Sequence, residues 1–186
     1  SFKKGCINND GIVPPNWDLV VNWNFPDKNK YPRKNFPKTH FLTGLEYVTL
    51  PESFDNEIIR QRLYCRPIKR LLVSIGGADA HNLTADIARK LLEESIDLHV
   101  TFILGAGFRG HEALNAVLKS AGFAYECKVA VENMFLEYLN CDVAIGAGGL
   151  TAFELMATHT PSLLVAVVDH QVKRCQYLAE QGMAVF

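Results

Sequence analysis

The sequence has 186 residues, 48% of them hydrophobic and 21% charged, and a formal net charge of −1 at pH 7. This composition excludes a disordered chain, and the length is sufficient for one domain with a substantial core. The near-neutral charge argues against a general nucleic-acid binder, and no apolar run is long enough to span a bilayer.

The five cysteines are scattered along the chain and form no CxxC pair. Dispersed thiols in odd number are typical of a reducing compartment, and no signal peptide begins the sequence, so we expect a cytoplasmic protein. Because no Cys and His cluster has the spacing of zinc ligands, we expect no metal site.

The first third of the chain indicates extended segments separated by loops. Residues 17–24 have the pattern of a strand, and residues 26–38, which are rich in Lys, Asn and Pro, predict a loop. Residues 41–50 predict a further extended segment, with Gly44 at a turn or bulge.

From Lys69 onward, strands and helices alternate regularly. The predicted strands are 70–75, 99–104, 125–130, 142–145 and 162–168, with a last strand starting at 183–186. The predicted helices are 84–94, 111–120, 133–139, a segment opening at 151–156, and 171–180, which Gly182 caps. This alternation predicts an α/β fold with a doubly wound parallel sheet and right-handed crossovers. We expect the strands 70–75, 99–104, 142–145 and 162–168 to be central.

The clearest functional signal lies in residues 140–171, NCDVAIGAGGLTAFELMATHTPSLLVAVVDHQ. Glycines between a buried strand and a helix let a ligand approach the backbone, and the helix start favours a phosphate. We expect a side chain at Gly149 to intrude on that phosphate or to require a strained φ. Glu154 lies about one turn into the helix, where its carboxylate can accept hydrogen bonds from ribose hydroxyls. Spacing alone leaves open a plain tight turn with a solvated Glu154.

Gly105, Gly107 and Gly110 spell GxGxxG after a strand and before a helix. The dinucleotide fingerprint normally belongs to the first strand of its domain, and no acidic strand end follows here at the expected spacing. We therefore interpret this segment as a loop facing an interdomain cleft and expect no cofactor, with NAD or FAD binding as the minor alternative.

Together these motifs resemble the nucleotide-binding segment of GT-B glycosyltransferases and related nucleotide-sugar enzymes. The matching pieces are GAGGLTAFELMATHTPSLLVAVVDHQ, SIGGADAHNLT from Ser74, ENMFLEYLNCDVAI from Glu132 and TGLEYVTLPESF from Thr43. The chain looks most like the UDP-amino-sugar hydrolases of pseudaminic acid synthesis. It is similar, more distantly, to the transferases that add N-acetylglucosamine to lipid I.

The resemblance implies a domain organisation and an activity. Residues 1–66 would be the end of an N-terminal domain and the interdomain linker, and residues 67–186 a UDP-binding, Rossmann-like C-terminal domain truncated at its end. The implied function is the nucleotide-binding half of a UDP-amino-sugar hydrolase in surface-glycan synthesis. A UDP-sugar glycosyltransferase domain and a non-enzymatic UDP-sugar-binding module are the alternatives. The implied partners are a UDP-sugar and an N-terminal domain of the same protein, which would carry the catalytic His. The catalytic residue is therefore unknown.

The resemblance also implies roles for individual residues. The loop with Gly76, Gly77, Asp79 and Asn82 would approach the diphosphate or the sugar, with an ordinary strand–helix turn as the alternative. The implied contacts in the later segments are Asn133 and Met134 at the uracil, Gly148, Gly149, Leu150 and Thr151 at the diphosphate, Glu154 at the ribose, and His170 and Gln171 at the sugar or phosphate. Met134 can equally be core filler. His170 departs from the Asn usual in the family, which leaves the sugar open.

Overall fold

The computed structural model of the protein describes residues 4–7, 16–23, 35–55 and 67–186. The chain divides into two compact units, residues 1–50 and 51–186. Each unit is described by itself.

The first unit contains a three-stranded parallel sheet of β1 (Gly5–Ile7), β2 (Leu19–Asn22) and β3 (His40–Thr43), in that order. The strand predicted within residues 17–24 is confirmed as β2. The extended segment predicted for 41–50 is only partly right. The chain leaves β3 at Gly44, whose φ of 133° suits glycine, and enters a 3-10 helix, η2 (Leu45–Tyr47). Most of the predicted loop 26–38 lies outside the described residues.

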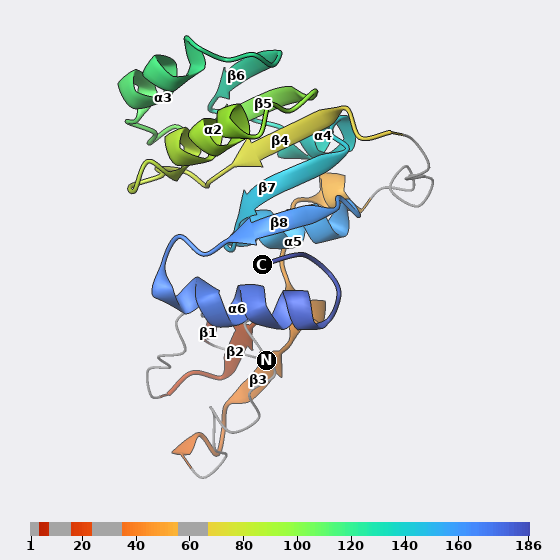
Figure 1. Cartoon of the computed structure of the whole chain (residues 1–186). Coiled ribbons are helices and arrows are strands. Elements are labelled where there is room, and N and C mark those ends of the chain that lie inside the picture. Colours follow the sequence, from red (N-terminus) through yellow and green to blue (C-terminus); the bar gives the residue numbers. More distant parts are fainter. Residues whose placement is uncertain (1–3, 8–15, 24–34, 56–66) are drawn as a thin grey trace. The chain divides into compact units, whose positions relative to one another are not determined.

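The second unit is organised around a five-stranded sheet in which every pairing is parallel (Figure 1). Its order is β6-β5-β4-β7-β8, with bounds β4 (Arg70–Ser74), β5 (His99–Leu104), β6 (Tyr125–Val129), β7 (Val143–Ala147) and β8 (Ser162–Val165). The order reverses between β4 and β7, because the chain builds outward from β4 to β6 before crossing back. Such a reversal is the switch point where open α/β sheets bind their ligands.

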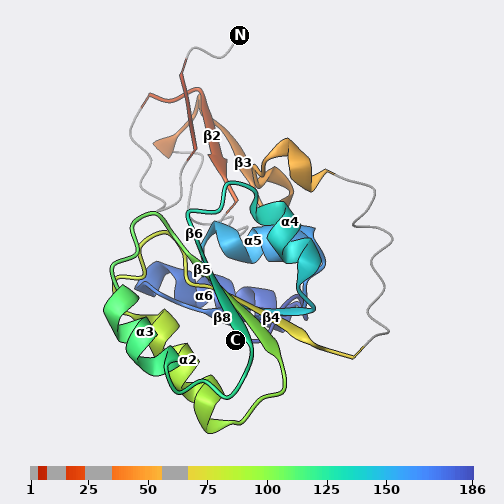
Figure 2. The same cartoon turned by 90° about the horizontal axis from the view of Figure 1, so that it is seen from above.

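Helices cover both faces of this sheet, so the doubly wound fold predicted from the alternation is confirmed. The helices are α2 (Leu83–Glu93), α3 (His111–Leu118), α4 (Met134–Asn140), α5 (Leu150–Ala157) and α6 (Asp169–Glu180), preceded by a 3-10 helix, η3 (Glu52–Phe54). Figure 2 shows α2 and α3 on one face of the sheet and α4 and α5 on the other. Helix α5 begins shortly after β7, so its amino end lies near the switch point between β4 and β7.

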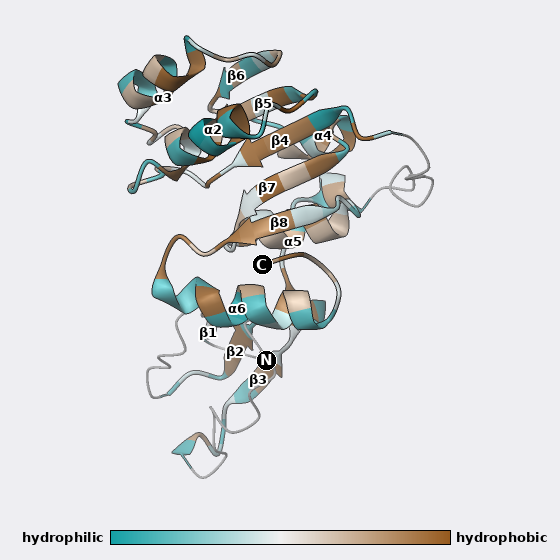
Figure 3. Cartoon of the chain, in the orientation of Figure 1, coloured by the Kyte–Doolittle hydropathy of each residue, from teal (hydrophilic) through white to brown (hydrophobic). Residues whose placement is uncertain are grey.

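The core lies between the sheet and its helices. Strand β4 is buried along nearly its whole length because both of its faces are covered, and Val73 is fully buried. Figure 3 shows this as brown along most of β4 and in parts of β7, with teal on α2, α3 and α6. On the α4 and α5 side, Tyr138 and Leu155 are fully buried. In the part of the chain that the structure describes, no helix combines the length and apolarity needed to cross a membrane.

Two details of the predicted sheet are wrong. Strand β8 is the last strand of the sheet rather than a central one, and it ends at Val165, opposite the last residue of β7. Residues 183–186 form no strand, and only an isolated bridge joins Val185 to Leu163. The predicted cap at Gly182 is confirmed, since its φ is 69° and it follows the end of α6.

A buried carboxylate fastens β7 to β4. Asp142 accepts hydrogen bonds from the backbone N–H groups of Lys69 (3.0 Å) and Arg70 (2.9 Å), and from the Arg70 guanidinium (3.4 Å). Because its acceptors are satisfied, this carboxylate is retained in the interior and fixes where the two strands begin.

Candidate functional site

A cavity of about 420 Å³ opens at the carboxyl ends of β4 and β5, beside the first turns of α4 and α5. Its volume lies within the usual range for small-molecule sites. Five of the residues predicted to bind nucleotide line it, namely Gly76, Gly77, Met134, Thr151 and Glu154. The lining residues not predicted are Ser74, Ile103, Leu104, Gly105, Ala106, Ala130, Val131, Glu132 and Tyr138. All of them belong to the second unit.

Two acidic residues, Glu132 and Glu154, line this cavity, and Glu154 comes from α5. Its Oε2 accepts a hydrogen bond of 2.8 Å from the phenol of Tyr138, which comes from α4. Burial raises the pKa of Glu154 above its ordinary value, and the Tyr138 hydrogen bond partly offsets that rise. Glu154 is therefore partly buried rather than fully solvated, it has no cation partner among the described residues, and its carboxylate is placed to receive hydroxyl donors.

The residues after β4 divide into a cavity wall and a helix cap. Gly76 and Gly77 line the cavity. Asp79 is 5% exposed, and its two oxygens accept hydrogen bonds of 2.8 Å from the backbone N–H groups of Leu83 and Thr84. Asp79 thus caps α2, as the alternative of an ordinary strand–helix turn predicts. Asn82 is exposed, in the left-handed region at φ 56°, and does not line the cavity.

The glycine turn before α5 is built mainly by packing. The Gly148 N–H donates to the Val165 carbonyl (2.9 Å), and the Gly148 carbonyl accepts from the Arg174 guanidinium (2.8 Å). The Gly148 amide is thereby occupied within the fold. Gly149 has a φ of −87°, and a Cβ added there would meet only the Gln171 amide at 3.6 Å. The expected strain at Gly149 is therefore wrong, although the exposed start of α5 remains open to an anion.

Arg174 is a residue that the sequence analysis did not single out. It is buried on α6, its guanidinium lies 5.3 Å from the Phe153 ring centroid, and burial lowers its pKa. Its position places a positive charge behind the glycine turn. No sequence motif indicates Arg174, because its hydrogen bond to the Gly148 carbonyl forms only when α6 packs against the glycine turn.

Of the remaining predicted residues, only Met134 lines the cavity. Asn133 caps α4, where its side-chain oxygen accepts from the Leu136 N–H at 3.4 Å, while Met134 beside it lines the cavity. Gln171 accepts from the Val167 N–H at 2.9 Å and approaches Gly149. His170 is exposed in the first turn of α6 and does not line the cavity.

The GxGxxG segment has a packing explanation. The Gly107 N–H donates to the Gly77 carbonyl at 2.9 Å, and a Cβ at Gly105 would overlap the backbone of Gly77. A Cβ at Gly110 would lie 2.5 Å from the Asn82 side-chain oxygen. These glycines let the segments after β4 and β5 approach each other closely, so packing is sufficient to explain why glycine is required there.

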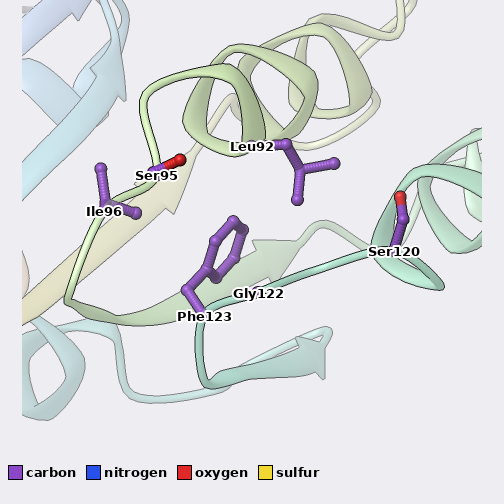
Figure 4. A pocket seen from close by; sticks show the side chains of 6 residues that line it. All are labelled: Leu92, Ser95, Ile96, Ser120, Gly122 and Phe123. Atoms are coloured by element: carbon purple, nitrogen blue, oxygen red, sulfur yellow. The ribbon is translucent and has the colours of Figure 1, made fainter.

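A second cavity, of about 410 Å³, lies at the amino ends of β5 and β6, and therefore at the opposite ends of the strands from the first cavity. Figure 4 shows the Phe123 ring between Ile96 and Leu92, with Ser95 and Ser120 nearby. It carries no charged group, and open α/β sheets bind their ligands at the carboxyl ends of strands. The first cavity is therefore the candidate site.

Comparisons with known proteins relate the chain to glycosyltransferases, although no protein-family model matches it. The chain is 33% identical over 146 residues to the UDP-N-acetylglucosamine–N-acetylmuramyl-(pentapeptide) pyrophosphoryl-undecaprenol N-acetylglucosamine transferase of Anaeromyxobacter dehalogenans, covering 68% of this chain and 37% of the relative. It is 26% identical over 174 residues to the spore coat polysaccharide biosynthesis protein SpsG of Bacillus subtilis, covering 90% of this chain and 49% of the relative.

The fold has a counterpart among solved structures. MurG of Acinetobacter baumannii superposes with a TM-score of 0.60 at 19% identity, over 90% of this chain and 52% of that one. The chain thus spans between about a third and a half of the length of these relatives. None of the three is named as a hydrolase. The chain has the parallel α/β fold of the C-terminal domain of a GT-B glycosyltransferase, and in sequence it is similar to an N-acetylglucosamine transferase and to a polysaccharide biosynthesis protein.

Proposed function

We propose that the second unit is the UDP-sugar-binding domain of a GT-B-type glycosyltransferase that acts in the cytoplasm in surface-polysaccharide synthesis. The observation that carries the proposal is Glu154, a partly buried carboxylate facing a cavity at the carboxyl ends of parallel strands. Similarity to a transferase whose name includes UDP-N-acetylglucosamine supports the choice of a UDP-sugar. It also moves the transferase ahead of the hydrolase expected from the sequence motifs.

Each part of the cavity has a separate task in this proposal. The Glu154 carboxylate accepts hydrogen bonds from the ribose hydroxyls, and such bonds are strong because the acceptor is charged. The N–H groups and dipole at the start of α5, together with the Thr151 hydroxyl, hold the diphosphate. Met134 packs against the base. The Gly76–Gly77 loop borders the space left for the sugar.

The domain binds the UDP part of the substrate, and we propose none of its residues as the catalytic base. UDP is the leaving group when the sugar is transferred, so holding its diphosphate stabilises the charge that develops as the glycosidic bond breaks. We expect the 186-residue chain to bind UDP weakly, with a Kd from about tens of micromolar to about 1 mM.

Isothermal titration calorimetry with UDP, CMP, GDP and NAD tests the proposal. We expect UDP to bind best, and we expect Glu154→Gln to weaken UDP binding by roughly tenfold to a hundredfold, the range for lost hydrogen bonds to a charged group. Glu180→Gln is the matched control, because it removes the same charge from an exposed position on α6. NAD binding better than UDP, or equal UDP binding by Glu154→Gln and wild type, would contradict the proposal.

A second assay separates transfer from hydrolysis. UDP release from UDP-N-acetylglucosamine and other UDP-amino sugars is measured with a longer protein that contains this domain, with and without lipid-linked acceptors. Release that requires the acceptor supports a transferase. Release in buffer alone assigns a hydrolase, and tight binding without release assigns a non-enzymatic binding module.

A further inference from the structure

Tyr138 holds an unusual position for a polar side chain. It is fully buried on α4, yet it also borders the cavity, and its hydroxyl donates to Glu154 Oε2 on a different helix. The two residues are 16 positions apart, and their hydrogen bond measures 2.8 Å.

The surroundings of Tyr138 fix where its hydroxyl lies. Its ring centroid is 6.4 Å from that of Phe54, and its carbonyl accepts from the Cys141 thiol (3.3 Å) and the Thr160 hydroxyl (3.4 Å). Both the ring and the backbone are therefore anchored. The phenol oxygen is thus held at hydrogen-bond distance from Glu154 Oε2.

The phenol of Tyr138 remains a hydrogen-bond donor at neutral pH. Burial, followed by the neighbouring Glu154 charge, raises the pKa of Tyr138 far above its ordinary value, although a hydrogen bond with Thr151 opposes this rise. In turn, the phenol favours the charged form of Glu154 against the cost of burial.

We propose that Tyr138 is a positioning residue of the nucleotide site, whose phenol holds the Glu154 carboxylate in the orientation that accepts the ribose hydroxyls. This inference rests on the proposed function and deepens it, because it names the group that prepares the ribose contact. In this proposal Tyr138 acts through Glu154 rather than by donating to the ligand itself. With Oε2 held by the phenol, Oε1 is left to face incoming donors, so the carboxylate pays no reorientation cost on binding.

Tyr138→Phe removes only the donor, since the ring and its packing remain. Glu154 then keeps its burial but loses the group that orients its carboxylate. Either rotation of the side chain away from the cavity or uptake of a proton weakens acceptance from the ribose. The effect is confined to ligands that carry ribose hydroxyls.

The experiment measures calorimetric binding of UDP and of 2′,3′-dideoxyuridine diphosphate to wild type, Tyr138→Phe and Glu154→Gln. For UDP we expect Tyr138→Phe to lose about tenfold in affinity, which corresponds to one charge-assisted hydrogen bond made less well. The dideoxy analogue should bind wild type and Tyr138→Phe equally, because it has no hydroxyl for Glu154. Tyr125→Phe is the control, since Tyr125 is exposed on β6 and does not line the cavity.

Three outcomes would overturn the inference. Unchanged UDP affinity in Tyr138→Phe shows that Glu154 needs no positioning group. If Tyr138→Phe loses equal affinity for UDP and for the dideoxy analogue, Tyr138 has a general packing role. A lower melting temperature of Tyr138→Phe that accompanies these equal losses leads to the same conclusion. If wild type binds no uridine nucleotide, the proposed function itself fails, and that result is separate because it appears before any variant is compared.

Discussion

At the scale of single residues, Glu154 places a charge where the fold favours a neutral group. Burial raises its folded-state pKa above the ordinary 4.5, so the folded state holds this proton more tightly than the unfolded state does. The stabilisation from this proton is complete below the unfolded pKa and is lost as pH rises through the folded pKa. At neutral pH the charged side chain thus costs stability.

The resulting prediction concerns Glu154→Gln. At pH 7 the variant should melt at a higher temperature than wild type, and the difference should vanish near pH 4, where both side chains are neutral. UDP binding by wild type should weaken as pH falls through the raised pKa. Thermal denaturation and calorimetry between about pH 4 and pH 8 check both statements. A lower melting temperature for Glu154→Gln at pH 7 would show that the carboxylate is a structural group.

A second prediction separates two adjacent glycines. A Cβ at Gly148 would overlap the Cys175 sulfur, so Gly148→Ala should lower the free energy of unfolding by about 1–3 kcal/mol, the cost of overpacking a core. A Cβ at Gly149 has ordinary space, so Gly149→Ala should keep the melting temperature but weaken UDP binding at the diphosphate. Denaturant unfolding and calorimetry on both variants decide the matter. Equal destabilisation by the two would contradict this assignment.

Residue roles could be predicted from the sequence where a local pattern carries them. Glu154 and Thr151 follow a glycine turn at fixed spacing, and the structure brings both to the cavity. Tyr138 and Arg174 could not be found in this way, because each acts through a neighbour on another element. Asp79 was expected at the ligand, yet both of its oxygens cap α2, a geometry visible only once the turn is folded.

At the scale of elements, the loops after β4 and β5 depend on each other. A Cβ at Gly105 would lie 2.5 Å from Gly77 Cα, so Gly105→Ala should force the two loops apart and cost about 1–3 kcal/mol of unfolding free energy. Gly77→Ala is the matched control, since nothing lies within 4 Å of its added Cβ. Chemical denaturation measures both, and a Gly105→Ala variant as stable as wild type would mean that the loops move freely.

Strands β4, β5 and β7 were predictable because each is a largely apolar run that leads into a glycine turn. The predicted 99–104 coincides with β5, and 70–75 exceeds β4 by one residue. The predicted end of the strand 162–168 was wrong. The apolar run continues beyond Val165, but β7 ends opposite that residue, so β8 has no further partner to pair with. Hydrophobicity specifies that a segment is buried, but the neighbouring strand decides where its pairing stops.

At the scale of the molecule, the cavity and its supporting core belong to one compact unit, residues 51–186. A fragment of these residues should therefore fold and bind UDP with an affinity within about threefold of the 186-residue chain, a difference below about 1 kcal/mol. Circular dichroism, thermal unfolding and calorimetry on the fragment check this. Loss of UDP binding by a folded fragment would place part of the site in residues 1–50.

The fold class was predictable from alternation alone, whereas the strand order and the activity were not. Alternation does not reveal that the chain reverses after β6, since that depends on which side of β4 the strand β7 joins. The relative named as an N-acetylglucosamine transferase favours the transferase alternative over the hydrolase expected from the motifs. The motifs themselves concern the nucleotide and contain no assigned catalytic residue that would separate the two activities.

The buried Asp142 has a consequence for how the protein is made. It joins β7 to residues that precede it by 72 and 73 positions, so one edge of β4 has no partner until β7 exists. At ribosomal speeds of about 5–20 residues per second, β4 waits roughly 4–14 s after its own synthesis. Throughout that interval one edge of β4 lacks its partner strand, so we expect slow translation at this stage to promote aggregation.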